Sequence, residues 1–67
     1  MLIVSQRLKE LRMSNNLTQS KVANIIKVSR VVYTRYENNQ REIPLELLCV
    51  LADYYHVTLD YLAGREN

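Results

Sequence analysis

The sequence has very few of the residues from which small proteins build covalent or metal cross-links. Its 67 residues include one cysteine, Cys49, and one histidine, His56. A lone cysteine permits no internal disulfide bond, and one cysteine with one histidine is too few for a zinc site. Because Cys49 lies within the apolar run 47–51, we interpret it as a packed thiol rather than a reactive one. We therefore expect no disulfide, no metal and no cofactor.

Long apolar runs are also missing, since no stretch approaches the ~20 apolar residues of a membrane span. Residues 1–4 are apolar but lack a preceding basic region and a following cleavage site, so we do not interpret them as a signal peptide. With 48% hydrophobic and 24% charged residues, the composition is that of a globular chain. We expect one cytoplasmic domain over residues 1–67, near the lower size limit for folding without cross-links.

Acidic residues are absent from one long stretch. Between Glu10 and Glu37 there is no carboxylate, yet five basic residues lie there: Arg12, Lys21, Lys27, Arg30 and Arg35. The net charge of +2 conceals this asymmetry, because residues 1–41 hold eight Lys and Arg against two acids, whereas residues 42–67 hold one Arg against five acids. A basic half of this kind indicates a polyanionic partner more strongly than an ordinary solvated face.

Residue combinations typical of enzymes are not found either. The sequence offers no carboxylate pair suited to acid–base catalysis, no Ser-His-Asp set, no glycine-rich phosphate loop and no metal cluster. We therefore expect no enzymatic activity and assign no catalytic residue.

Apolar periodicity predicts a first helix over residues 4–14. Val4, Leu8 and Leu11 follow the spacing i, i+4, i+7 and so share one face. Asn15 and Asn16 are expected to end this helix, because asparagine tolerates the left-handed backbone angles that glycine usually supplies there.

A repeated local pattern marks three further helix starts. An apolar residue is followed by Ser or Thr and then, after three residues, by another apolar residue, which fits an N-cap hydroxyl flanked by a hydrophobic staple. The capping residues are Thr18, Ser29 and Thr58. They predict helices over residues 18–26, 30–37 and 59–63, and Gly64, the only glycine, ends the last.

A fourth helix is predicted over residues 44–55, with Pro44 as its first residue. Its apolar positions go nearly all the way round, more than one buried stripe requires, so we expect a second contact surface on it. Tyr54 and Tyr61 have no clear core position and are assigned to an interface. No strand and no domain boundary is found, and the predicted fold is a compact all-α bundle of five helices.

The segment 28–39 is the one that the other helices are expected to support. A helix here keeps Val32, Tyr33 and Tyr36 on one buried face, with Tyr33 in the core, and presents on the other face Arg30, Val31, Thr34, Arg35 and Asn38. A guanidinium fits paired acceptors such as phosphate oxygens or guanine O6 and N7. We interpret this segment as a DNA-recognition helix; the major groove of duplex RNA is too deep and narrow for a helix.

Only Lys27 and Val28 separate the preceding helix from the cap at Ser29, and two helices joined so tightly must cross steeply. Six fragments follow one another at compatible spacing: R-L-K-E-L-R (7–12), L-T-Q (17–19), V-S-R (28–30), R-Y-E-N (35–38), L-A-D-Y-Y (51–55) and L-D-Y-L-A-G (59–64). Together they resemble the phage-repressor (Cro/XRE-like) helix-turn-helix family of transcription regulators, over residues 4–64. The resemblance implies a lambda-repressor-like five-helix DNA-binding domain with the helix-turn-helix in helices two and three.

The resemblance also implies roles for individual residues. The positions that usually face base edges in the major groove are those of Arg30, Val31 and Arg35, with Thr34 close by. The positions that usually contact DNA phosphates are those of Gln19, Asn38, Asn39 and Arg41. In the family pattern the arginine ending the first helix pairs with the glutamate ending the recognition helix, so Arg12 and Glu37 are expected to form a structural salt bridge.

The chain departs from the family where glycine is usual, because Lys27, Asn39 and His56 stand at these positions. Left-handed angles cost a non-glycine residue roughly 1 kcal/mol, and less for asparagine and histidine, so Lys27 is the unusual one. We hypothesise that Lys27 is kept for a DNA phosphate contact despite local strain.

One recognition helix makes too few contacts for selective binding, and members of this family commonly bind as two-fold dimers on inverted half-sites about 34 Å apart. The sequence therefore predicts a homodimeric, sequence-specific repressor that binds double-stranded DNA and dimerises through its fourth and fifth helices, with no membrane or small-molecule ligand. The alternative is a protein-interaction module, such as an antitoxin or regulator subunit, with weak or no specific DNA binding. The acid-free basic stretch argues against this alternative.

Overall fold

The computed structural model describes residues 1–66 of the chain, and every regular element in that range is an α-helix. The five helices are α1 (Leu2–Ser14), α2 (Gln19–Ile25), α3 (Arg30–Glu37), α4 (Leu45–Tyr55) and α5 (Leu59–Leu62). The predicted all-α, five-helix fold is thereby confirmed. None of the described helices is long and apolar enough to cross a membrane.

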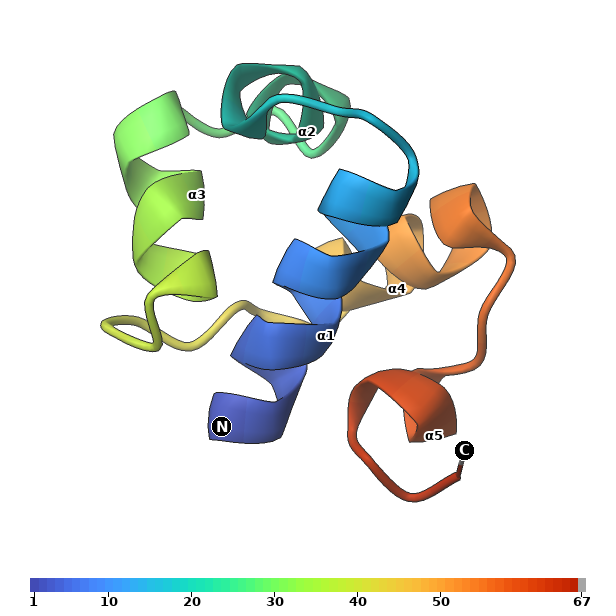
Figure 1. Cartoon of the computed structure of the whole chain (residues 1–67). Coiled ribbons are helices and arrows are strands. Elements are labelled where there is room, and N and C mark those ends of the chain that lie inside the picture. Colours follow the sequence, from blue (N-terminus) through green and yellow to red (C-terminus); the bar gives the residue numbers. More distant parts are fainter. Residues whose placement is uncertain (67) are drawn as a thin grey trace.

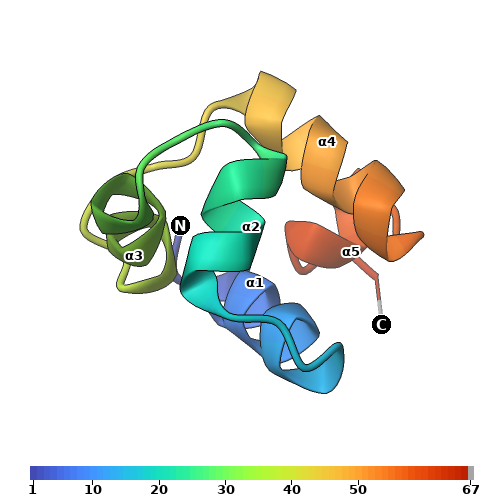
Figure 2. The same ribbon diagram turned by 90° about the horizontal axis from the view of Figure 1, so that it is seen from above.

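Helix α1 lies between α3 and α5, which contact it on opposite sides (Figures 1 and 2). Helix α2 crosses above α1 and packs most extensively on α3, the arrangement expected of a helix-turn-helix. Helix α4 packs against α5 at the back of the view in Figure 1. This arrangement supports α3 from one side only and leaves its other face to solvent.

Each helix contributes one completely buried side chain to a single core: Leu8, Val22, Tyr33, Leu51 and Leu62, all with 0% exposure. Burying an aliphatic side chain of this size stabilises the fold by about 1.5–3 kcal/mol. Because the five side chains come from five helices, no helix can be removed without opening this core.

The three predicted N-caps are confirmed. The side-chain oxygens of Thr18, Ser29 and Thr58 accept hydrogen bonds from the backbone N–H three residues later, at 3.0, 3.2 and 3.0 Å. Each bond satisfies one of the backbone donors that a helix start leaves unpaired, and is worth about 1 kcal/mol. The caps therefore fix the starts of α2, α3 and α5.

Three helix starts differ from the prediction, and the smallest difference is at α2, which begins at Gln19 with Thr18 as its N-cap. Helix α1 begins at Leu2, two residues earlier than expected. Pro44 is not the first residue of α4 but its N-cap, so that expectation was wrong. The φ of −61° at Pro44 suits either position, but its ψ of 147° is extended, and its carbonyl accepts the first helical hydrogen bond from Leu48.

Left-handed residues follow the helices and turn the chain. The three positions at which glycine is usual in the resembling family have positive φ, with Lys27 at 60°, Asn39 at 58° and His56 at 57°, and Asn16 has 57°. The only glycine, Gly64, has φ of 77°, and a Cβ atom there would lie 2.7 Å from Ile3 Cγ1. The angle at residue 64 thus favours glycine, and the close approach of α1 leaves no room there for a Cβ atom.

Candidate nucleic-acid interface

Helix α3 has one anchored face and one exposed face. Tyr33 and Tyr36 are 0% and 3% exposed, and their rings meet edge to face with centroids 6.5 Å apart. On the opposite face Val31 is 53% exposed, and Arg30 and Arg35 are exposed as well. The aromatic pair fixes the rotation of α3 about its axis, and this rotation determines which side chains face outward.

Exposed cations extend this face at both ends of α3. Lys27 precedes the helix in the tight turn, Arg41 follows it in the loop to α4, and Lys21 lies in the first turn of α2. None of the five exposed basic residues (Lys21, Lys27, Arg30, Arg35 and Arg41) pairs with a carboxylate in the part of the chain that the structure describes. Their charges are therefore available to an anionic partner.

The arrangement also shows where the other predicted contact residues lie. Asn38 and Asn39 are exposed at the C-terminal end of α3, whereas Thr34 and Gln19 are partly buried between α3 and the start of α2. The residues predicted to face bases thus lie on one helix face, and those predicted to contact phosphates are split between the turn before α3, the start of α2 and the loop after α3.

Beneath α3 lies an ion pair between Arg12 and Glu37. Arg12 Nε donates to Glu37 Oε2 at 2.6 Å and Arg12 Nη2 to Oε1 at 3.2 Å, while Arg12 Nη1 donates to the Leu17 carbonyl at 3.0 Å. The side chains are only 15% and 1% exposed. This bidentate pair ties the last turn of α3 to the end of α1 and, through Leu17, to the chain that enters α2.

The surroundings keep both members of this pair charged. Burial raises the pKa of Glu37, but the hydrogen bonds from Arg12 and Gln19, together with the nearby Tyr33 hydroxyl, outweigh burial and hold that pKa below its ordinary value. The hydrogen bond to Glu37 raises the pKa of Arg12. Glu37 is therefore a carboxylate at neutral pH and can only accept hydrogen bonds.

Gln19 joins this ion pair to the exposed face of α3. Its Nε2 donates to Glu37 Oε1 at 3.2 Å, and its Oε1 accepts from the Thr34 hydroxyl at 2.8 Å. Thr34 and Gln19 were predicted to contact DNA. In the structure they also hydrogen-bond to each other, and Gln19 hydrogen-bonds to Glu37. Gln19 thus connects the start of α2 to two successive turns of α3.

Two tyrosine hydroxyls are buried beside this cluster. Neither Tyr33 nor Tyr55 makes a hydrogen bond of normal geometry through its hydroxyl, although Tyr33 lies close enough to Glu37 to lower the pKa of that carboxyl. Burial raises the pKa of Tyr55 to about 12 and raises that of Tyr33 further. Both phenols are therefore neutral, and each adds an unpaired donor to the interior.

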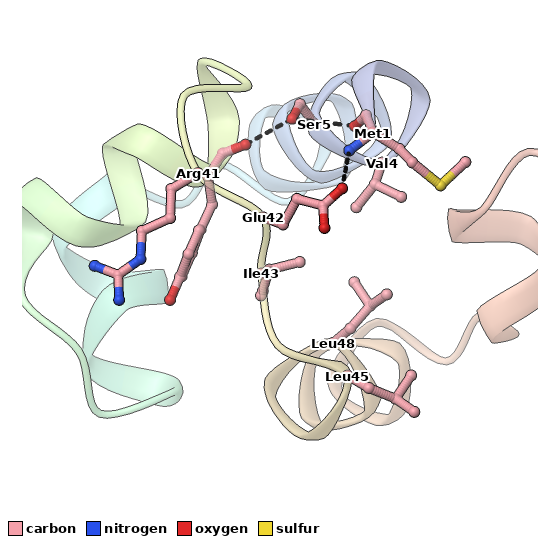
Figure 3. Close-up of a pocket in the computed structure, with 9 residues that line it drawn as sticks. Met1, Val4, Ser5, Arg41, Glu42, Ile43, Leu45 and Leu48 are labelled. Atoms are coloured by element: carbon pink, nitrogen blue, oxygen red, sulfur yellow. Dashed lines mark hydrogen bonds and ion pairs between the residues drawn. The ribbon is translucent and has the colours of Figure 1, made fainter.

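Ser5 is a residue whose role the sequence analysis missed. It is 4% exposed, and its hydroxyl donates to the Tyr36 carbonyl at 2.7 Å, joining α1 to the last turn of α3 (Figure 3). The sequence does contain a sign of this role, because Ser5 stands three residues before Leu8 and therefore lies on the same buried face of α1. A polar residue on such a face indicates a specific hydrogen bond.

A half-open pocket of about 170 Å³ lies behind the loop from α3 to α4 (Figure 3). The start of α1, the loop residues 41–43 and the start of α4 line it, and Leu45 at its edge is 66% exposed. Most of its walls are apolar side chains, and Arg41 of the exposed basic set is also among the residues that line it.

An all-α domain whose second and third helices meet through a tight turn, with the third exposing basic side chains, has the architecture of a helix-turn-helix protein. The family model described as helix-turn-helix matches residues 8–62. The chain belongs to this helix-turn-helix family, of the Cro/XRE type, a non-enzymatic family that includes transcription regulators.

Curated relatives carry the same domain. The chain is 37% identical over 59 residues to the HTH-type transcriptional regulator YobD and 38% identical over 61 residues to the HTH-type transcriptional regulator AnsR, both of Bacillus subtilis strain 168. These matches cover 88% and 91% of this chain and 53% of each relative. The cryptic phage CTXphi transcriptional repressor RstR of Vibrio cholerae is 32% identical over 62 residues, which are 92% of this chain and 55% of RstR.

The chain thus spans about half the length of the curated relatives it matches. No solved structure gives a significant match to it.

Proposed function

We propose that the chain is a sequence-specific DNA-binding transcription regulator acting in the cytoplasm. The observation that carries this proposal is the exposed face of α3, where Arg30, Val31 and Arg35 point outward with no carboxylate among them. A helix of this kind fits the major groove of B-form DNA, where each base pair presents a distinct pattern of donors and acceptors. Membership of the helix-turn-helix family supports the same conclusion.

The proposed contacts follow from side-chain chemistry. Arg30 and Arg35 donate in pairs to O6 and N7 of guanine, and Val31 packs on a thymine methyl group. The residues assigned to DNA phosphates are Gln19, Lys27, Asn38, Asn39 and Arg41. Each bidentate base contact discriminates against a wrong base by about 1–3 kcal/mol, whereas the phosphate contacts fix the register without selecting sequence.

We further propose that the protein acts as a homodimeric repressor on an inverted repeat. The exposed apolar residues Val50 and Tyr54 on one side of α4, at 42% and 43%, and Leu59 at the start of α5, at 37%, supply the dimer surface. A dimer doubles the base contacts, and selective binding requires this doubling when each protomer inserts one short helix. The similarity to RstR, a transcriptional repressor, supports the direction of regulation.

The test is selection from a randomised duplex pool, followed by fluorescence-anisotropy titration of the enriched duplex at two salt concentrations. We expect an enriched inverted repeat whose affinity falls steeply with salt. The double variant Arg30→Ala, Arg35→Ala should lose this affinity and keep its helical circular dichroism. The matched control is Arg65→Ala, which removes an exposed arginine beyond α5 and should bind with nearly unchanged affinity.

A folded protein that enriches no motif would contradict the proposal. It would favour the alternative of a protein-interaction module that uses the same fold with weak or no specific DNA binding.

A further inference from the structure

Two hydrogen bonds connect Glu37 through Gln19 to Thr34 on the exposed face of α3, and the donor and acceptor of each are fixed. Glu37 is ionised, so it accepts and cannot donate. The amide of Gln19 must then turn its NH₂ group toward Glu37, and Gln19 Nε2 lies 3.2 Å from Glu37 Oε1. The charge on Glu37 thereby settles which end of the Gln19 amide faces which partner.

This orientation fixes the hydroxyl of Thr34 as well. With its NH₂ group on Glu37, Gln19 turns Oε1 toward Thr34, and an amide oxygen only accepts. The Thr34 hydroxyl has one proton and donates it to Gln19 Oε1 at 2.8 Å. Toward a ligand on the α3 face, Thr34 therefore offers an acceptor lone pair and a methyl group, and no donor.

We propose that Gln19 is a positioning residue that sets base specificity: it makes Thr34 an acceptor-only contact in the major groove. This inference rests on the proposed function and deepens it. An acceptor pairs with the N6 amino group of adenine or the N4 amino group of cytosine, and it repels the O6 and N7 acceptors of guanine. At the base that Thr34 faces, the operator therefore carries adenine or cytosine and excludes guanine.

Gln19 can position Thr34 and still contact DNA. An amide nitrogen has two protons, and Nε2 uses one of them on Glu37. The second N–H is available to a DNA phosphate. One side chain thus connects the backbone contact to the base contact.

The test compares the motifs selected from a randomised duplex pool by the wild-type protein, Thr34→Val, Thr34→Ser and Gln19→Met. Thr34→Val keeps the methyl group and removes the acceptor, so it identifies the position by losing the preference for adenine or cytosine there. Thr34→Ser keeps the hydroxyl and should retain the preference. Gln19→Met frees the hydroxyl proton, so guanine should rise at this position by about fivefold or more while the other positions stay unchanged.

Several outcomes would overturn the inference. One is a wild-type preference for guanine at the position that Thr34→Val changes. Another is a Gln19→Met variant that selects the same motif as the wild-type protein, because losing a phosphate contact or a purely structural contact lowers affinity without changing base preference. If Gln19→Met does not fold, the two Thr34 variants decide, because equal motifs from Thr34→Val and Thr34→Ser contradict an acceptor at residue 34. A wild-type protein that enriches no motif fails the proposed function itself, which distinguishes the two failures.

Discussion

The ion pair of Arg12 with Glu37 is the residue-scale contact that most strongly ties the candidate recognition helix to the rest of the fold. Replacing Arg12 by methionine leaves a carboxylate that is 1% exposed without its cation. We expect Arg12→Met to lower the free energy of unfolding by about 3 kcal/mol, measured by urea denaturation. The control is Arg35→Met, which removes an exposed arginine from α3 and should change stability by less than about 0.5 kcal/mol. Equal effects of the two variants would contradict this role.

The same pair predicts a pH dependence of stability. The pKa of Glu37 is lower in the folded protein than its ordinary value of 4.5, so the stability that it contributes is present above pH 4.5 and is lost as the pH falls through the folded pKa. In Glu37→Gln this loss should be missing. Urea denaturation at a series of pH values between neutral and about pH 3 should therefore give a shallower acid decline for Glu37→Gln. Parallel curves for the two proteins would show that Glu37 is not held ionised by its partners.

The buried hydroxyl of Tyr55 predicts a stabilising substitution. It has no hydrogen-bond partner, and a buried polar group without one costs about 1–3 kcal/mol. Tyr55→Phe should therefore raise the free energy of unfolding by about 1 kcal/mol, measured by thermal or urea denaturation. Tyr54→Phe is the matched control, because Tyr54 is 43% exposed and removing its hydroxyl should change the free energy of unfolding very little. A destabilised Tyr55→Phe would mean that the hydroxyl has a partner in solution.

At the scale of elements, the tight turn between α2 and α3 combines strain with charge. Lys27 has φ of 60°, which costs a residue with a Cβ atom about 1 kcal/mol relative to glycine. We expect Lys27→Gly to raise the melting temperature and to lower DNA affinity, with a smaller dependence of affinity on salt. Lys27→Asn should lose affinity to the same degree with less gain in stability, because asparagine tolerates this angle better than lysine.

The outcome that refutes the phosphate contact is specific. If Lys27→Gly is more stable and binds DNA with unchanged affinity and salt slope, the strain at Lys27 has no compensation in DNA binding.

At the scale of the whole molecule, charge and apolar surface are separated. Basic residues surround α3, whereas α4 exposes the apolar side chains of Leu45, Val50 and Tyr54 and the acidic side chains of Glu46 and Asp53. A DNA-binding protein with this division keeps its anionic half away from the phosphates, and its exposed apolar residues are free to contact a second copy.

This division predicts the effect of a charge on the proposed dimer surface. Val50→Glu should weaken binding to a duplex with two half-sites by tenfold or more, because it places a carboxylate in an apolar contact. Binding to a single half-site should change much less, and analytical ultracentrifugation should show a monomer. Met13→Glu is the control, since Met13 is 58% exposed on α1. Equal behaviour of the two variants on both duplexes would place the dimer surface elsewhere.

The sequence by itself determined what depends on residues close together in the chain. Helix number and the three N-caps involve contacts within about four residues, and periodicity and cap chemistry encode such contacts directly. The left-handed angles at Lys27, Asn39 and His56 are equally local, but they were expected from the family resemblance. Pro44 was misplaced by one position because its fixed φ fits both the N-cap and the first helical residue, and only ψ distinguishes them.

Only the tertiary structure decided the contacts between helices. Ser5 meets Tyr36 across 31 residues, and Gln19 meets Thr34 across 15, because α1, α2 and α3 cross at one place. Spacing along the chain carries no information on such crossings, and the Arg12–Glu37 pair was expected only from a family resemblance. The direction of the bonds from Glu37 through Gln19 to Thr34 likewise requires the three side chains to be in contact, since a charge fixes the orientation of a neighbour only at hydrogen-bond distance.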